Sequence, residues 1–221
     1  TKNMSIKSIA LALGNDENAT EGKVLQSITA LKLAKETAET RGVHMPDLNI
    51  PIDEKFTIHF KKNGGKFLYC DSFSEISQAL KNIVDENSWQ DHPFFIMDQR
   101  LEDKFSKEHI SFTKKAKNSE VFFTTCEHLI AQNGSILVCS NQLNEKKLNE
   151  LPPNVIVFAT TSQLVESIGE GLKKIKKKYG HSIPANITTL KHFQADEENS
   201  DDFLTYGSSS KNLYLLFLED L

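Results

Sequence analysis

From residue 52 to the end of the chain, short apolar runs alternate with segments of helical periodicity. Strands that alternate with helices form βαβ units, and the strands of such units pair in parallel. The expected fold class is therefore α/β, with a mostly parallel sheet and helices on both faces. The predicted strands comprise residues 66–70, 94–97, 110–112, 121–124, 135–139, 155–159, 186–190 and 213–218.

The helical segments are placed by apolar spacing and by their caps. The first, residues 54–62, is expected to end at Asn63-Gly64-Gly65, because glycine suits a helix C-cap. A hairpin through Asn63-Gly64 is the competing interpretation, since this stretch also suits a strand. Ser72 is the predicted N-cap of a second helix whose apolar face carries Ile76 and Leu80. Further helical segments are expected at residues 101–105, 126–131 (a single turn) and 162–178.

Residues 1–45 have a different texture. Thr20 is followed by apolar residues at helical spacing, which predict one amphipathic helix. The prolines at 46 and 51 then favour an extended linker. Two parts are therefore expected, an N-terminal helical arm or appended segment over residues 1–45 and a domain over residues 46–221.

Composition argues against several classes of partner. The net charge of −4 gives no basic field for nucleic acid. The lysine run at residues 173–178 is interpreted as a solvated helix end, with an anionic partner site as the alternative. No apolar run approaches the roughly 20 residues of a membrane span.

Cysteine and histidine usage argues against metal sites and disulfides. The three cysteines, Cys70, Cys126 and Cys139, contain no CxxC pair and are odd in number. The histidines lack metal-ligand spacing, so no metal is expected. A reducing cytoplasm is the simplest compartment. Neither GxGxxG nor GxxxxGK[ST] occurs, so no dinucleotide or P-loop cofactor is expected.

Ligands of open parallel sheets bind beyond the carboxyl ends of the strands. One candidate loop follows residues 121–124, and another, residues 206–211, precedes the last strand. The second loop offers hydroxyls, backbone N–H groups and one ammonium, which are the parts of an anion cradle. The candidate ligand-binding residues are Thr125, Gln132, Asn133, Gly134, Ser135, Gly207, Ser208, Ser209 and Lys211.

Cys126, Glu127 and His128 place a nucleophile, an acid and a base in a row. Adjacent side chains point apart on helices and strands, so these three do not converge as neighbours. Cys126 is expected to be a small buried residue. Glu127 is the candidate catalytic residue.

The stretch TTCEHLIAQNGSILVCSNQ resembles the core motif of the LUD domain family, which includes the lactate-utilisation protein LutC. Flanking pieces are similar in the same order: Phe56, Phe60 and Gly64-Gly65, then Leu151-Pro152 and NVIVFA, then residues 162–165, and finally Lys211-Asn212-Leu213. The ending KNLYLLFLEDL is similar to that of short LUD-domain proteins of Bacteroidetes-type bacteria. The resemblance covers about residues 45–221.

This resemblance implies a NagB/RpiA/CoA-transferase-like fold and a link to lactate oxidation beside iron–sulfur partner proteins. Many members of the family have an acid where this chain has Gln132. An amide forms no acyl anhydride and does not titrate, so this residue counts against a transferase reaction.

Three functions are therefore carried forward. The first is the binding of a small anionic metabolite, with residues 133–135 and 208–211 as the cradle. The second is a non-catalytic interaction module on this fold. The third is a CoA- or sugar-phosphate-handling enzyme that uses Glu127.

Overall fold

The computed structural model describes residues 50–144, 146–191, 193 and 211–220. The expected arm, residues 1–45, lies outside this range, as do Gly207, Ser208 and Ser209. The helices are α3 (Ile52–Lys62), α4 (Phe73–Glu86), α5 (Gln99–Lys104), α6 (Ser140–Leu143) and α7 (Ile168–Tyr179). The strands are β1 (Lys66–Cys70), β2 (Phe94–Ile96), β3 (Phe112–Thr113), β4 (Val121–Thr125), β5 (His128–Ile130), β6 (Ser135–Val138), β7 (Asn154–Thr160), β8 (Leu164–Val165), β9 (Thr188–Leu190) and β10 (Asn212–Leu218).

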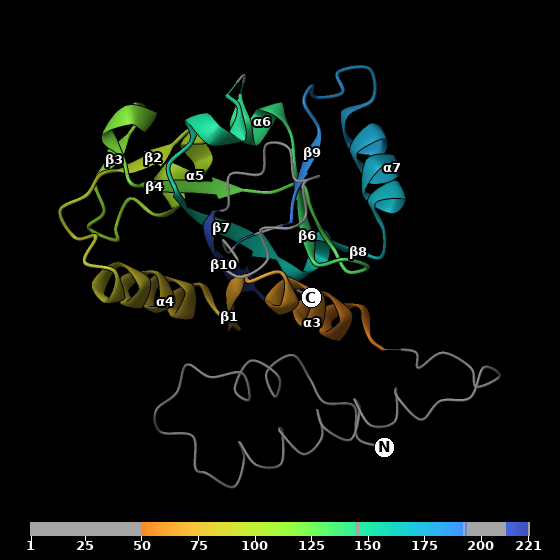
Figure 1. Ribbon diagram of the computed structural model, residues 1–221, viewed down its shortest axis with the longest axis horizontal. Coiled ribbons are helices and arrows are strands. Elements are labelled where there is room, and N and C mark those ends of the chain that lie inside the picture. The colour runs from red at the N-terminus through yellow and green to blue at the C-terminus, as the bar shows by residue number, and fades with distance from the viewer. Residues whose placement is uncertain (1–49, 145, 192, 194–210, 221) are drawn as a thin grey trace, which may run out of the picture.

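A parallel sheet of six strands, in the order β1-β10-β7-β4-β2-β3, forms the centre of the molecule (Figure 1). Its register aligns Val121 of β4 with Asn154 of β7, and Asn154 with Asn212 of β10. At the other end Thr125 pairs with Phe158. All strands therefore end at the same edge, and the expected α/β fold with a mostly parallel sheet is confirmed.

Different layers cover the two faces of this sheet. The amphipathic helix α4 and the short helix α5 pack on one face. There Leu80 and Phe105 belong to one buried cluster with the strand residues Phe94, Phe123 and Ile156. On the other face lie α3, through Phe56 and Phe60, and a second sheet. The apolar side chains that these layers direct at the sheet are almost fully buried, so each layer contributes hydrophobic stabilisation.

The second sheet, in the order β8-β5-β6-β9, corrects two predictions. Residues 126–131 were expected to form a helical turn, but His128–Ile130 is strand β5, antiparallel to β6. Residues 186–190 were expected to complete the main sheet, whereas β9 pairs with β6. The β5–β6 hairpin packs its apolar side against the main sheet, and this burial selects the strand conformation.

Helix α7 begins later than its periodicity predicts. Residues 162–178 were expected to form one helix, yet Thr161–Gln163 form a 3-10 turn and Leu164–Val165 form β8, which pairs with β5. The helix starts after Ser167, whose hydroxyl accepts a hydrogen bond from the backbone N–H of Glu170. Strand pairing and this N-cap therefore determine the boundary.

The N-terminal helices follow the sequence closely. Ser72 caps α4 by accepting from the N–H of Glu75. Helix α3 ends at Lys62 with Asn63 as its C-cap, and Gly64 adopts a positive φ of 85°. A hairpin through Asn63-Gly64 is therefore wrong. None of the described helices has the length and apolarity needed to cross a membrane.

Candidate functional site

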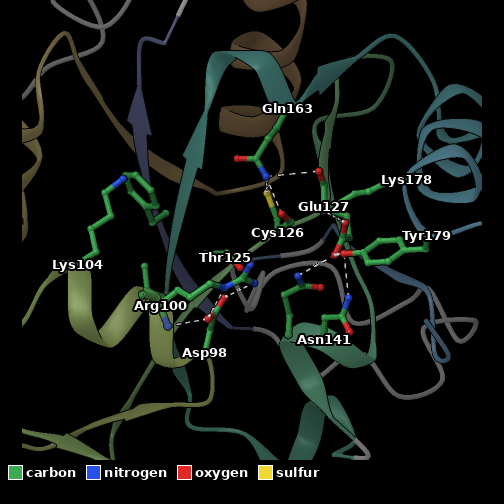
Figure 2. A pocket seen from close by; sticks show the side chains of 13 residues that line it. Asp98, Arg100, Lys104, Thr125, Cys126, Glu127, Asn141, Gln163, Lys178 and Tyr179 are labelled. Atoms are coloured by element: carbon green, nitrogen blue, oxygen red, sulfur yellow. Dashed lines mark hydrogen bonds and ion pairs between the residues drawn. The ribbon is translucent and has the colours of Figure 1, made fainter. Parts of the chain in front are cut away.

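A cavity of about 330 Å³ opens at the carboxyl edge of the main sheet (Figure 2). Its floor comes from the ends of β4 and β7, through Thr125 and Phe158. Asp98, the N-cap residue of α5 in the short loop after β2, lines one side together with α5. The remaining walls come from α6, the 3-10 turn before β8 and the end of α7. The lining residues are Asp98, Arg100, Leu101, Lys104, Thr125, Cys126, Glu127, Asn141, Gln142, Phe158, Gln163, Lys178 and Tyr179.

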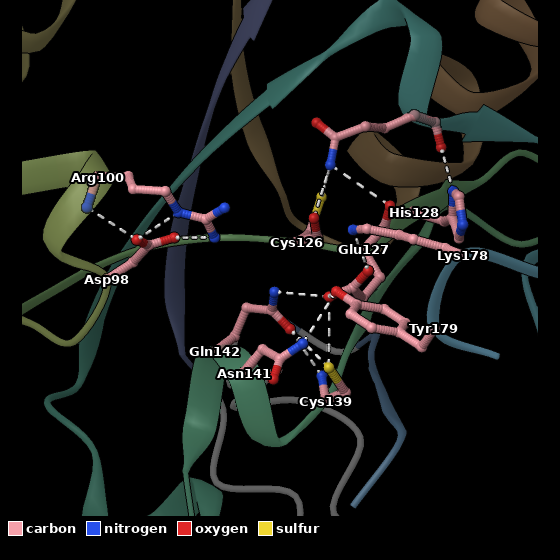
Figure 3. Close-up of polar contacts among 11 residues, drawn as sticks. Asp98, Arg100, Cys126, Glu127, His128, Cys139, Asn141, Gln142, Lys178 and Tyr179 are labelled. Atoms are coloured by element: carbon pink, nitrogen blue, oxygen red, sulfur yellow. Dashed lines mark hydrogen bonds and ion pairs between the residues drawn. The ribbon is translucent and has the colours of Figure 1, made fainter. Parts of the chain in front are cut away.

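Glu127 is the centre of a hydrogen-bond network in this cavity (Figure 3). Its Oε1 accepts from Tyr179 Oη at 2.9 Å and from Gln142 Nε2 at 3.0 Å. The Cys139 thiol lies 3.4 Å from the same oxygen, and Lys178 Nζ is 3.0 Å from Oε2. One carboxylate therefore joins β5, α6 and the last turn of α7.

These contacts determine the ionisation of Glu127. Burial by itself would raise the pKa of this carboxyl group, but hydrogen bonds from Gln142, Lys178 and Tyr179 outweigh it and lower the pKa to about 2. Glu127 is therefore an ionised acceptor with both oxygens occupied. This state suits an anchor better than a general acid.

The two glutamines of the wall are also committed to the protein. Gln142 Oε1 accepts from the N–H of Cys139 at 2.9 Å. Gln163 Oε1 accepts from the N–H of Thr160 at 2.8 Å, while its Nε2 donates to the carbonyl of Cys126 at 2.6 Å. These amides shape the wall because their hydrogen-bonding groups already have protein partners.

Three cations line the cavity, and two of them have acidic partners. Arg100 Nη2 is 3.3 Å from Asp98 Oδ2, and Lys178 pairs with Glu127. Lys104 Nζ instead lies over two aromatic rings, 4.5 Å from the centroid of Phe158 and 5.1 Å from that of Phe73. Among the described residues, Lys104 has no carboxylate partner. Figure 2 shows Asp98, Arg100 and Lys104 on one side of the cavity and Lys178 and Tyr179 on the other.

The cysteines are free and buried. Burial raises the pKa of the Cys126 thiol well above its ordinary range and that of Cys139 to about 11. Both are therefore protonated thiols near neutral pH, which are weak nucleophiles. His128 Nδ1 lies 3.2 Å from the carbonyl of Gln163, and the Cys126 thiol lies 3.7 Å from Gln163 Nε2, so Cys126, Glu127 and His128 form no catalytic triad.

The structure separates the residues predicted for a ligand site. Thr125 and Glu127 line the cavity. Gln132, Asn133, Gly134 and Ser135 lie instead at the turn of the β5–β6 hairpin, at the end of β5 remote from Glu127.

This turn packs against α3. Asn63 Nδ2 donates to the carbonyls of Asn133 at 2.8 Å and Gly134 at 3.2 Å. A Cβ on Gly134 would lie 2.3 Å from the backbone of His59 and Phe60, and its φ is +64°. Asn133 Oδ1 accepts from the hydroxyl of Ser135 at 2.7 Å. The turn therefore has a packing role that requires glycine.

Lys211 lies at the opposite edge of the main sheet from the cavity. It precedes Asn212, which is in register with Asn154 at the amino ends of the strands. Its side chain is buried, and Nζ donates to the carbonyl of Leu151 at 2.8 Å. Burial lowers its pKa. The other predicted members of this loop, Gly207, Ser208 and Ser209, lie outside the described residues, so the cradle stays a prediction.

Most polar lining residues were missed by the sequence reasoning, among them Asp98, Arg100, Lys104, Asn141, Gln142, Gln163 and Tyr179. A signal existed for the first of these. Asp98 directly follows the predicted strand at residues 94–97, so the carboxyl-edge rule also applied to this loop. Lys178 belongs to the lysine run at residues 173–178, for which an anionic partner site was the alternative interpretation, and it reaches the cavity with Tyr179 through tertiary packing of α7.

A parallel six-stranded sheet flanked by helices, with a polar cavity at its carboxyl edge, defines an α/β domain, and this arrangement is consistent with the NagB/RpiA-like fold that the resemblance implies. The family model of the LUD domain matches residues 54–217, and the chain belongs to this family. No curated protein matches the chain. A solved structure, a DUF162 family protein from Deinococcus radiodurans, is similar in fold, with a TM-score of 0.51 and 11% identity over 79% of this chain and 100% of that one.

Proposed function

We propose that this LUD domain binds a small anionic metabolite in the cavity at the carboxyl edge of the main sheet. The observation that carries the proposal is Lys104, a cation at the cavity that has no carboxylate partner among the described residues. The cavity volume of about 330 Å³ suits a small metabolite.

Some polar groups of the lining are available to a ligand, and others already have hydrogen-bond partners within the protein. Both oxygens of Glu127 and both amides of the wall already have protein partners. Lys104 and the hydroxyl of Thr125 have no such hydrogen bond among the described residues, so they are the proposed ligand contacts. Arg100 is a further donor, because its extended guanidinium carries more N–H groups than Asp98 uses.

Calorimetric titration with butyrate, a small carboxylate, tests the location of the site. We expect Lys104→Met to weaken binding at least tenfold, since it removes the unpaired charge and keeps the stem over the rings. Lys81→Met, on the exposed face of α4, is the matched control and should leave affinity unchanged. If Lys211→Met weakened binding and Lys104→Met did not, the loop at residues 207–211 would be the anion site instead.

A non-catalytic module is the second candidate, and the state of Glu127 favours it. Its pKa of about 2 and its full set of hydrogen bonds do not suit a nucleophile or an acid. A thioester exchange assay on the wild type and Glu127→Gln separates this candidate from a CoA-handling enzyme. Exchange that is present in the wild type and lost in the variant would contradict the non-catalytic assignment.

The biological setting is proposed from the resemblance to LutC and to short Bacteroidetes-type LUD proteins. This resemblance supports a role in lactate or related organic-acid utilisation, with iron–sulfur proteins as partners. A cytoplasmic location is proposed from the three cysteines, which are free and buried.

A further inference from the structure

Asp98 brings a fixed negative charge to the mouth of the cavity. Its Oδ1 accepts from the backbone N–H of Arg100 at 3.0 Å, which caps α5. The same carboxylate pairs with the guanidinium of Arg100. The side chain of Asp98 is 21% exposed and that of Arg100 is 92% exposed. The carboxylate is thus partly buried, whereas the guanidinium extends into solvent.

The charges of the lining nearly balance. Arg100, Lys104 and Lys178 are opposed by Asp98 and Glu127, which leaves one net positive charge among these residues. Glu127 is 1% exposed in its side chain and is covered by four protein contacts. Asp98 is therefore the acid of the lining that faces an incoming anion at the α5 side.

We propose that Asp98 is a specificity-determining residue that restricts the cavity to ligands with a single negative charge. This inference rests on the proposed anion site. The first negative charge of a ligand is balanced by Lys104. A second negative charge would meet Arg100 or Lys178, and each of these cations is already paired with a carboxylate, while Asp98 repels the incoming charge at the α5 side. Like charges a few ångströms apart at a partly exposed site reduce affinity about tenfold.

The test is a calorimetric titration of the full chain with butyrate and succinate near neutral pH. These probes share a four-carbon chain and differ by one charge. We expect the wild type to prefer butyrate. Asp98→Asn keeps an N-cap side chain and removes the charge, so the ratio of the two affinities should shift toward succinate about tenfold. The thermal midpoint of the variant checks that α5 is intact.

Arg100→Gln provides a second, opposite variant. It leaves the Asp98 charge without its partner, so the affinity ratio should shift further toward butyrate. If wild type and Lys104→Met behave as proposed and neither variant changes the ratio, Asp98 does not determine specificity, while the anion site stands. If neither probe binds to the wild type or to Asp98→Asn, the proposed function fails together with this inference.

Discussion

Glu127, the candidate catalytic residue of the sequence, connects three elements of the fold. It links the start of β5 to Gln142 of α6 and to Lys178 and Tyr179 at the end of α7. An ionised carboxylate with 1% side-chain exposure persists only where its oxygens are paired. The sequence predicted its position beside a strand end. It did not predict the side chains that lower its pKa, Gln142, Lys178 and Tyr179, because tertiary contacts bring them to Glu127.

The first residue-scale prediction concerns pH. The folded pKa of Glu127 is about 2, below its ordinary value of 4.5, so ionisation favours the folded state above that value. This stability is lost as the pH falls from 4.5 toward 2. Urea unfolding across this range should therefore show a shallower dependence on pH in Glu127→Gln than in the wild type. Parallel curves for the two proteins would contradict the assignment of Glu127 as an ionised anchor.

The second residue-scale prediction compares two glycines. Gly134 and Gly180 both adopt positive φ, at +64° and +58°, but a Cβ meets the backbone of α3 only at Gly134. Gly180→Ala should cost about 1–3 kcal/mol of unfolding free energy from backbone strain alone. Gly134→Ala should cost about 1–3 kcal/mol more, because the hairpin turn must move away from α3. Equal costs in chemical denaturation would show that the turn does not pack against α3.

At the scale of elements, the two hairpin strands show where sequence patterns were ambiguous. The run before Asn133-Gly134 is short and apolar, and such runs fit a helical turn or a strand equally well. The Asn-Gly pair between two apolar runs was the available signal for a hairpin. In the structure, β5 gains partners on both sides, β6 and β8, and these pairings decide the conformation.

The start of helix α7 was ambiguous in the sequence for the same reason. Leu164 and Val165 fit the helical spacing of the later residues, yet they pair with β5. Ser167 and Glu170 form an S-x-x-E pattern, which marks the true start of the helix. By contrast, α3 and α4 were predicted well, because their apolar faces and caps lie within one continuous segment.

Asp220 leads to a prediction at this scale. Its carboxylate accepts from the hydroxyl and the N–H of the 3-10 turn, at 2.8 Å from Thr161 Oγ1 and 2.8 Å from Ser162 N. This contact fixes the turn that carries Gln163 into the cavity wall. Asp220→Ala should lower stability by about 1 kcal/mol and raise hydrogen exchange at residues 126–128 and 160–163.

Asp91→Ala is the control, since Asp91 is an exposed acid in the turn before β2. If hydrogen exchange at these residues rose equally in both variants, or in neither, the claim that Asp220 holds the turn of the cavity wall in place would be wrong.

At the scale of the whole molecule, the sheet has two edges with different contents. The carboxyl edge carries the cavity, and the amino edge carries Lys211 in a buried position. The alternation of strands and helices predicted the parallel sheet. It did not predict the second sheet, because antiparallel pairing between short strands far apart in the chain depends on how the layers pack. Of the predicted cradle, the described residues Asn133, Gly134, Ser135 and Lys211 lie apart from Thr125 and Glu127.

The most direct test of the central claim is a map of backbone amide shifts during titration with butyrate. A site at the carboxyl edge predicts that the amides which shift belong to residues 98–104, 125–127, 141–142 and 158–163, with those of residues 131–135 and 211–213 unchanged. Shifts confined to residues 131–135 and 207–213 would contradict the account and place the anion at the hairpin turn and the loop before β10.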